Sequence, residues 1–97
     1  MTKLDIVNEA SNMTGLTKVE TEAILESVIL CISNALKRGE RVDIRGFGSF
    51  IIKERNARDA HNPATLEVVH LAKRYIPDFK VSKLLKEKVN NSLINKK

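Results

Sequence analysis

The segment between residues 18 and 38 is apolar around more of its circumference than a small single-chain fold requires. A helix with so wide an apolar stripe is normally buried on several sides. The chain has 97 residues, which allows one domain, so we interpret the segment as a dimer core. Packing within a three-helix monomer is the alternative. The apolar side chains are Ala23, Ile24, Leu25, Val28, Ile29, Leu30, Cys31, Ile32, Ala35 and Leu36.

Local signals mark the ends of two helices in this first part of the chain. Apolar residues at helical spacing predict a helix over residues 3–14, with Thr2 as N-cap and Gly15 just beyond its end. Residues 17–20 read Thr-Lys-Val-Glu, a capping box that starts the apolar helix. Gly39 follows two cations, Lys37 and Arg38, and is expected to end this helix. Cys31 is expected to be a buried packing thiol.

The pattern then changes from helical to extended. Residues 41–45 alternate polar and apolar side chains, which predicts a half-buried strand with Arg41, Asp43 and Arg45 on its outer face. Gly46-Phe47-Gly48 permits a tight turn, and a second strand follows over 49–52. Near the end of the chain, Ser82 is the expected N-cap of a short amphipathic helix.

Residues 53–76 form the most unusual stretch, because its first half has almost nothing apolar to bury. Polar legs around Asn62-Pro63 predict a hairpin that extends away from the body of the protein. Legs of about ten residues reach roughly 30 Å, enough to curl around a DNA duplex. A disordered loop is the alternative, and both interpretations hold if the hairpin becomes ordered only on binding.

Charge separates the two halves of the chain. Residues 1–40 carry four basic and six acidic side chains, a net charge of −2, whereas residues 41–97 carry thirteen and six, a net charge of +7. This segregation indicates a face that binds a polyanion, with an ordinary solvated surface as the alternative. The chain has no apolar run of about 20 residues and no apolar leader. With a single cysteine, it is expected in the cytoplasm, without membrane contact.

Catalysis is not expected from this sequence. His61 and His70 lie on the predicted arm with no nucleophile or set of metal ligands around them. We therefore expect no enzyme activity, cofactor, metal or small-molecule substrate. The alternative to a protein that binds and bends duplex DNA is a basic dimeric scaffold, or an RNA-binding protein, that does not bend DNA. RNA-binding modules usually expose stacking aromatics, and only Tyr75 is expected to do so, because the three phenylalanines look like core residues.

Several motifs together resemble the bacterial HU and integration host factor family over residues 2–90. The motifs are Gly39-Glu40-Arg41, Gly46-Phe47-Gly48-Ser49-Phe50, Arg58 followed by Asn62-Pro63-x-Thr65, and Pro77-x-Phe79-Lys80-x-x-Lys83-x-Leu85-Lys86. The resemblance implies an α+β fold: an intertwined dimer with a helical base, a small antiparallel sheet and two extended β-hairpin arms. Residues 1–97 would be one domain, divided into a dimerisation part (1–39), a sheet and arm (40–81) and a C-terminal helix (82–94).

The same resemblance implies an architectural protein of the bacterial nucleoid. As a homodimer, or a heterodimer with a related subunit, it would bind the minor groove of double-stranded DNA and bend it. Pro63 matches the arm-tip proline, whose rigid ring would wedge between base steps. The DNA-binding residues would be Lys3, Arg45, Gly46, Lys53, Arg55, Arg58, His61, Asn62, Pro63, Lys73, Arg74, Lys80, Ser82, Lys83 and Lys86.

The chain resembles the beta-type subunit of integration host factor most closely around residues 40–50. In that subunit, the arginine that matches Arg45 enters the minor groove, oriented by the acidic residue that matches Asp43; a simple surface ion pair is the alternative. The arm tip departs from the family pattern, because His61 replaces an arginine and Leu66 replaces a glycine. These departures make the tip's charge dependent on pH and replace a residue that would tolerate a positive φ in the turn.

Overall fold

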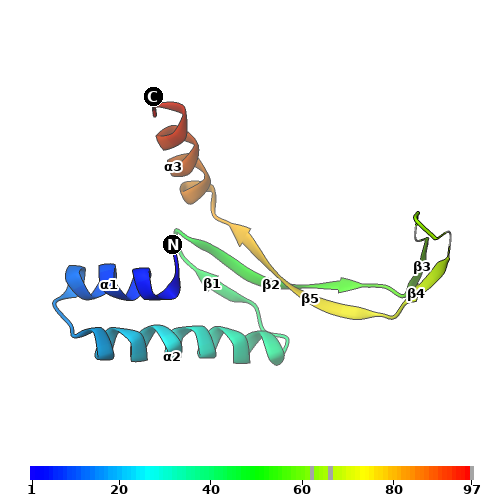
Figure 1. Ribbon diagram of the computed structural model, residues 1–97, viewed down its shortest axis with the longest axis horizontal. Coiled ribbons are helices and arrows are strands. Elements are labelled where there is room, and N and C mark those ends of the chain that lie inside the picture. Colours follow the sequence, from blue (N-terminus) through cyan, green and yellow to red (C-terminus); the bar gives the residue numbers. More distant parts are fainter. Residues whose placement is uncertain (62, 66, 97) are drawn as a thin grey trace. The chain divides into compact units, whose positions relative to one another are not determined.

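A computed structural model of the chain describes residues 1–61, 63–65 and 67–96. It has an α+β fold with antiparallel sheets, as expected (Figure 1). Met1–Ala35 form one compact unit, and the chain from Leu36 onward forms a second. The elements in chain order are α1 (Lys3–Thr14), α2 (Lys18–Lys37), β1 (Val42–Ile44), β2 (Gly48–Arg55), β3 (Arg58–His61), β4 (Val68–Leu71), β5 (Arg74–Val81) and α3 (Lys83–Ile94).

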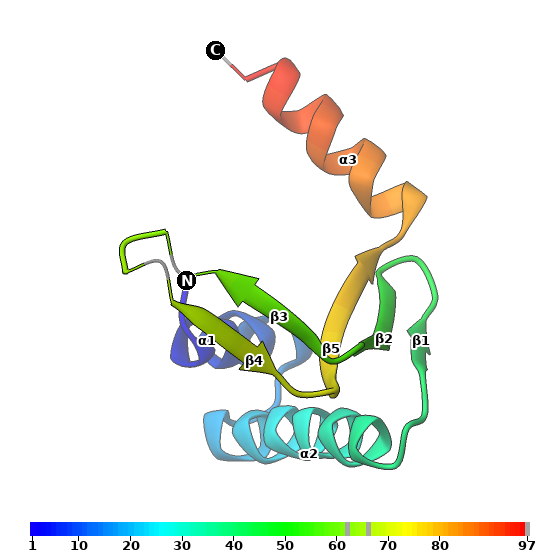
Figure 2. The same cartoon turned by 90° about the vertical axis from the view of Figure 1, so that its right-hand side faces the viewer.

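The first unit consists of α1 and most of α2, which run side by side (Figures 1 and 2). Thr2 caps α1: its backbone N–H donates to the Asp5 carboxylate at 2.8 Å, and its hydroxyl accepts from Asp5 N at 3.4 Å. Thr17 and Glu20 exchange equivalent bonds of 3.2 and 3.1 Å at the start of α2. The Thr17 hydroxyl, which donates to the Glu20 carboxylate at 2.8 Å, and the Thr17 backbone N–H together lower the pKa of the Glu20 carboxyl. Both predicted N-caps are confirmed.

Most of the apolar surface of α2 has no cover within a single chain. Ile24, Val28 and Leu30 are 53%, 47% and 59% exposed, and only Val7 and Ala35 are buried apolar residues in the described part of the chain. Cys31 is exposed as well, so the expectation of a buried thiol is wrong for the isolated chain. The reason is geometric, because α1 can cover only one side of α2. Large exposed apolar patches mark sites where another surface binds.

The sheet of the second unit has the order β1-β2-β5, with both pairings antiparallel. A turn at residues 45–47 joins β1 to β2, and Gly46 has a φ of 83° that suits glycine. The expectation that Gly48 is also a turn residue is wrong, since Gly48 is buried in β2. A Cβ there would lie 2.5 Å from the carbonyl oxygen of Lys80 and 2.5 Å from the Phe79 ring. Gly48 therefore allows β5 to pack closely.

Side chains alternate between the two faces of the β2–β5 ribbon. One face is largely apolar, and its Phe79 ring lies 5.1 Å from Phe47 and 4.9 Å from Phe50, between ring centroids. Phe47 and Phe79 are still 46% and 37% exposed, so the phenylalanines are core residues only in part. We call the opposite face the basic face. It consists of Ser49, Ile51, Lys53 and Arg55 from β2 and Arg74, Ile76, Asp78 and Lys80 from β5.

Beyond Arg55 and Arg74, the chain continues into a separate two-stranded sheet of β3 and β4 (Figure 1). We call this sheet the distal hairpin. Its antiparallel register runs from the pair Arg58–Leu71 to the pair His61–Val68, and described residues 63–65 form a turn at its end. The predicted long hairpin over residues 53–76 is thus confirmed in outline. Its tip residues Asn62 and Leu66 lie outside the described residues.

Candidate nucleic-acid interface

Two arginines face each other on the basic face. Arg55 of β2 is the direct register partner of Arg74 of β5. Like charges placed directly across a sheet repel one another. Among the described residues, neither guanidinium makes an ion pair, although Arg74 donates to the Ala72 carbonyl oxygen at 3.5 Å. Such a pair is stabilised by an anion that contacts both groups.

Lys53 lies on the same face and already has an acidic partner. Its Nζ is 2.8 Å from an Asp78 carboxylate oxygen. This hydrogen bond, together with one from the backbone N–H of Phe79, lowers the pKa of the Asp78 carboxyl. Both side chains are roughly half exposed, so the pair is solvated and its attraction modest. Lys53 can therefore release Asp78 and bind an external anion in its place.

Lys73 does not join the other cations. Its Nζ lies 2.8 Å from a Glu54 carboxylate oxygen and 5.7 Å from the centroid of the Tyr75 ring. Glu54 and Tyr75 are register partners on the apolar face of the ribbon. The Lys73 ammonium therefore lies on the face of the ribbon opposite Arg55 and Arg74, with which the sequence had grouped it.

The turn between β1 and β2 meets the start of α3. The Ser82 hydroxyl accepts from Leu85 N at 3.1 Å, as predicted for an N-cap, and donates to the Gly46 carbonyl oxygen at 2.9 Å. This places the turn beside the first residues of α3, which include Lys83 and, a turn later, Lys86. Free backbone N–H groups at a helix start favour anions. The junction thus brings together five candidate residues, Arg45, Gly46, Ser82, Lys83 and Lys86.

Arg41 was not among the residues assigned to DNA binding. Its Nε donates to an Asp43 carboxylate oxygen at 2.7 Å, and the Ser49 hydroxyl donates to the same oxygen at 2.6 Å. These bonds, from Ser49 first and Arg41 second, lower the pKa of the Asp43 carboxyl. Ser49 is in turn the register partner of Lys80, so Arg41 extends the basic face. The alternation of residues 41–45 was the signal that could have identified it.

In the free chain, Asp43 is not paired with Arg45, the residue that it would orient according to the resemblance to the beta-type subunit. Within the described residues, it bonds to Arg41 and Ser49 rather than to Arg45. Arg45 lies in the turn and not on β1. Residues two apart share a face only while the strand continues. Because the backbone changes direction after β1, Asp43 and Arg45 do not share one.

The remaining candidates are dispersed. Arg58 and His61 are exposed on β3, and Pro63 is exposed in the turn at the end of the distal hairpin. Lys3 belongs to the helical unit, where its Nζ lies 2.9 Å from a Glu26 carboxylate oxygen. The Glu26 hydrogen bond and charge raise the pKa of Lys3.

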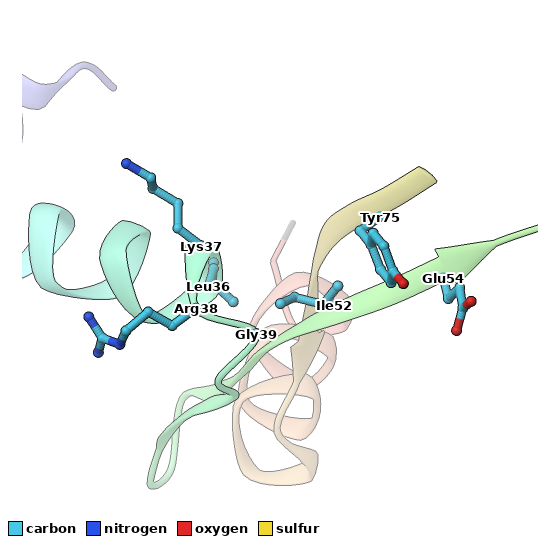
Figure 3. A pocket seen from close by; sticks show the side chains of 7 residues that line it. All are labelled: Leu36, Lys37, Arg38, Gly39, Ile52, Glu54 and Tyr75. Atoms are coloured by element: carbon cyan, nitrogen blue, oxygen red, sulfur yellow. The ribbon is translucent and has the colours of Figure 1, made fainter. Parts of the chain in front are cut away.

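A hollow of about 530 Å³ lies beside the apolar face (Figure 3). Leu36 at the end of α2 lines it together with Ile52 of β2 and Tyr75 of β5, while Lys37, Arg38, Gly39 and Glu54 form its polar edge. Its carboxylate, from Glu54, is paired with Lys73. The lining offers an apolar contact surface and no pairing of a nucleophile with a base.

Two further features bear on the kind of site that is present. Within residues 1–61, 63–65 and 67–96, no cluster of three or more His, Cys, Asp or Glu side chains is arranged to hold a metal ion. None of the helices in this described part is both long and apolar enough to cross a bilayer.

Comparisons with known proteins identify the family. Residues 1–90 match the family model described as bacterial DNA-binding protein. DNA-binding protein HU of Clostridium pasteurianum is 38% identical over 90 residues, covering 93% of this chain and 99% of that protein. The beta subunit of integration host factor from Marinobacter nauticus is 42% identical over 94 residues, covering 96% of each.

Solved structures agree with the sequence matches. Anabaena HU, from a cocrystal with DNA, superposes with a TM-score of 0.85 at 35% identity, covering 92% of this chain and 97% of that one. A variant of HU from Thermotoga maritima gives a TM-score of 0.70 at 31% identity, with coverages of 92% and 99%. The chain therefore belongs to the bacterial DNA-binding protein family that contains HU and the subunits of integration host factor.

Proposed function

We propose that the protein is a dimeric architectural subunit that binds the minor groove of double-stranded DNA and bends it. The observation that carries the proposal is the basic face, on which Arg55 and Arg74 oppose each other and neither forms an ion pair among the described residues. Phosphates relieve this repulsion, and neutralised phosphates provide most of the affinity in complexes of this kind. Membership in a family of DNA-binding proteins, one of them crystallised with DNA, supports the same choice of ligand.

Dimerisation accounts for the exposed apolar surface of α2. A second subunit that covers Ile24, Val28 and Leu30 would remove from water side chains that are each about half exposed in one chain. It would also bury Cys31, as the sequence led us to expect. The whole chain would then act as one domain of the dimer. The partner is a second copy or a related subunit, because similar proteins include HU and both subunit types of integration host factor.

Sedimentation of the purified chain tests this part of the proposal. A stable species of twice the 10.9 kDa chain mass would establish the homodimer. A folded monomer at micromolar concentration would contradict a dimer core. A chain that folds only when mixed with a related subunit would identify a heterodimer.

The distal hairpin would enter the minor groove with Pro63 as the wedge. Pro63 is exposed in the turn at its end, and minor-groove proteins kink DNA by inserting apolar side chains between base steps. The ring of proline is rigid and loses little entropy when it is ordered. Lys83 and Lys86, at the start of α3, would bind phosphates instead. A role of this kind places the protein in the cytoplasm, on the bacterial nucleoid, without catalytic activity.

Gel shifts combined with end-to-end distances on short labelled duplexes test the mechanism. Pro63→Ala should reduce bending more than affinity, whereas Lys83→Ala with Lys86→Ala should mainly reduce affinity. Binding without shortening of the end-to-end distance would refute bending. Equal effects of the two variants on bending and affinity would remove the wedge assignment. Preference for RNA over duplex DNA would favour the alternative of an RNA-binding protein.

A further inference from the structure

Two isoleucines lie among the charged side chains of the basic face. Ile51 of β2 is the register partner of Asp78, and Ile76 of β5 is the register partner of Lys53. Side chains alternate along a strand, so both isoleucines point away from the aromatic cluster of the apolar face. Ile51 is half-buried, and Ile76 is 37% exposed. We call these two residues, which are diagonal neighbours across the strands, the isoleucine pair.

Cations surround the isoleucine pair on the same face. The ion pair of Lys53 and Asp78, 2.8 Å between Nζ and a carboxylate oxygen, spans the other diagonal and so runs between the two isoleucines. The opposed Arg55 and Arg74 lie one row further toward the distal hairpin, and Lys80 lies one row beyond Asp78 in the other direction. A nucleic acid that reaches these cations therefore also meets the isoleucine pair.

The sugar is the part of a nucleic acid that an apolar side chain on such a face can distinguish. Burial of apolar surface is favourable only against a surface that is itself apolar. Deoxyribose presents C–H groups in the minor groove, whereas ribose presents its 2′-hydroxyl there. A hydroxyl pressed against an isoleucine loses its hydrogen bonds to water and gains none in return. The isoleucine pair therefore favours a deoxyribose over a ribose at the same position.

We propose that Ile51 and Ile76 are specificity-determining residues, which contact sugars in the minor groove and make the protein prefer DNA over RNA. The inference rests on the proposed function, in which the basic face binds this groove. The cations of the face cannot provide the preference by themselves, because the phosphates they bind are the same in DNA and RNA. The isoleucine pair thus adds a contact that reads the chemistry of the sugar and not the charge of the backbone.

The expected size of the preference follows from the exposure of the pair. A hydroxyl buried without a hydrogen-bond partner weakens binding by a factor between about 5 and 100. Ile76 is 37% exposed in the free protein, so the groove covers only a limited apolar surface. The preference for deoxyribose should therefore be about 5-fold, at the lower end of this range. It should not depend on salt, because salt acts on the phosphate contacts.

Competition against a fluorescently labelled DNA duplex tests the inference at two salt concentrations. One competitor is the same DNA, and the other is that duplex with isolated ribonucleotides in one strand, which keeps the number of phosphates. The parent protein should bind the second competitor about 5-fold more weakly at both salt concentrations. Ile51→Thr with Ile76→Thr keeps the β-branched shape but adds hydroxyls that can pair with a 2′-hydroxyl, so the ratio should approach one. Val81→Thr, on the opposite face of β5 and 43% exposed, is the matched control and should keep the ratio of the parent.

The outcomes separate this inference from the proposed function. Equal affinity of the parent protein for both competitors would overturn the inference alone, and so would an unchanged ratio in the double threonine variant. A ratio that collapses equally in Val81→Thr would assign the effect to the sheet as a whole and not to the isoleucine pair. If the double variant does not fold in urea denaturation, Ile76→Thr, at the more exposed of the two positions, takes its place. Failure of the parent protein to bind either duplex would instead refute the proposed function.

Discussion

Replacing Arg55 by glutamine should have opposite effects on stability and on DNA binding. In the free protein, Arg55 lies directly across from Arg74 and forms no ion pair within the described residues. The Asp78 carboxyl, whose pKa the Arg55 charge helps to lower, offsets only part of their repulsion. The substitution removes one of the two like charges and keeps most of the side-chain length. The free sheet should become more stable, while the proposed complex loses a phosphate contact.

Both magnitudes follow from the arrangement. Repulsion between two like charges directly across a sheet costs about 0.2–1 kcal/mol, so the free energy of unfolding of each subunit should rise by an amount in this range. The proposed dimer would lose two cations, and each neutralised phosphate contributes about 0.9 to the magnitude of the negative slope of log K against log salt concentration. The magnitude of this negative slope should therefore fall by about 1.8. This corresponds to roughly 60-fold weaker binding of the variant at about 0.1 M salt and to almost no difference in affinity near 1 M.

Fluorescence anisotropy with a labelled duplex over a range of salt concentrations measures the slope, and urea denaturation measures the stability. Lys18→Gln is a suitable control, because Lys18 is an exposed cation in the helical unit and should leave the slope unchanged. An unchanged slope in Arg55→Gln, or a loss of affinity that persists in full near 1 M salt, would refute the role of the opposed arginines.

Three further predictions concern the scaffold of the interface. Gly48→Ala should cost about 2–3 kcal/mol in urea denaturation, because its Cβ would meet a carbonyl oxygen at 2.5 Å. Gly39→Ala, with no atom within 4 Å and a φ of 81°, should cost about 1 kcal/mol; equal costs would contradict the packing argument. The pKa values of Asp43 and Asp78 are lowered in the folded protein from the ordinary carboxyl value of 3.8. These two carboxylates therefore stabilise the fold fully at a pH above 3.8. Their contribution to the free energy of unfolding is lost as the pH falls through their lowered pKa values. Asp78→Asn should thus show a smaller decrease in melting temperature between about pH 5 and pH 2.5 than the parent protein, and an identical decrease would contradict this account. Ser82→Ala should cost about 1 kcal/mol and accelerate amide exchange at the start of α3; unchanged exchange there would show that the cap is dispensable.

Local hydrogen bonding explains why the helix boundaries could be predicted. Thr17 and Glu20 are three residues apart, and Ser82 caps Leu85 at the same spacing, so each pair meets as soon as the first helical turn forms. The extended hairpin could be predicted for a related reason, because polar residues around a turn have no core to join. Its division into β2–β5 and the distal hairpin was not visible in the sequence.

The charge segregation of the chain and its family motifs were determined by the sequence alone, and with them the general position of the proposed DNA-binding face. The tertiary structure decided which cation meets which partner. Lys73 binds Glu54, and Asp43 binds Arg41 through a contact that also includes Ser49. These pairings depend on strand register and on the side of the sheet to which each side chain points. Register is set by pairing between distant segments, so no local pattern contains it.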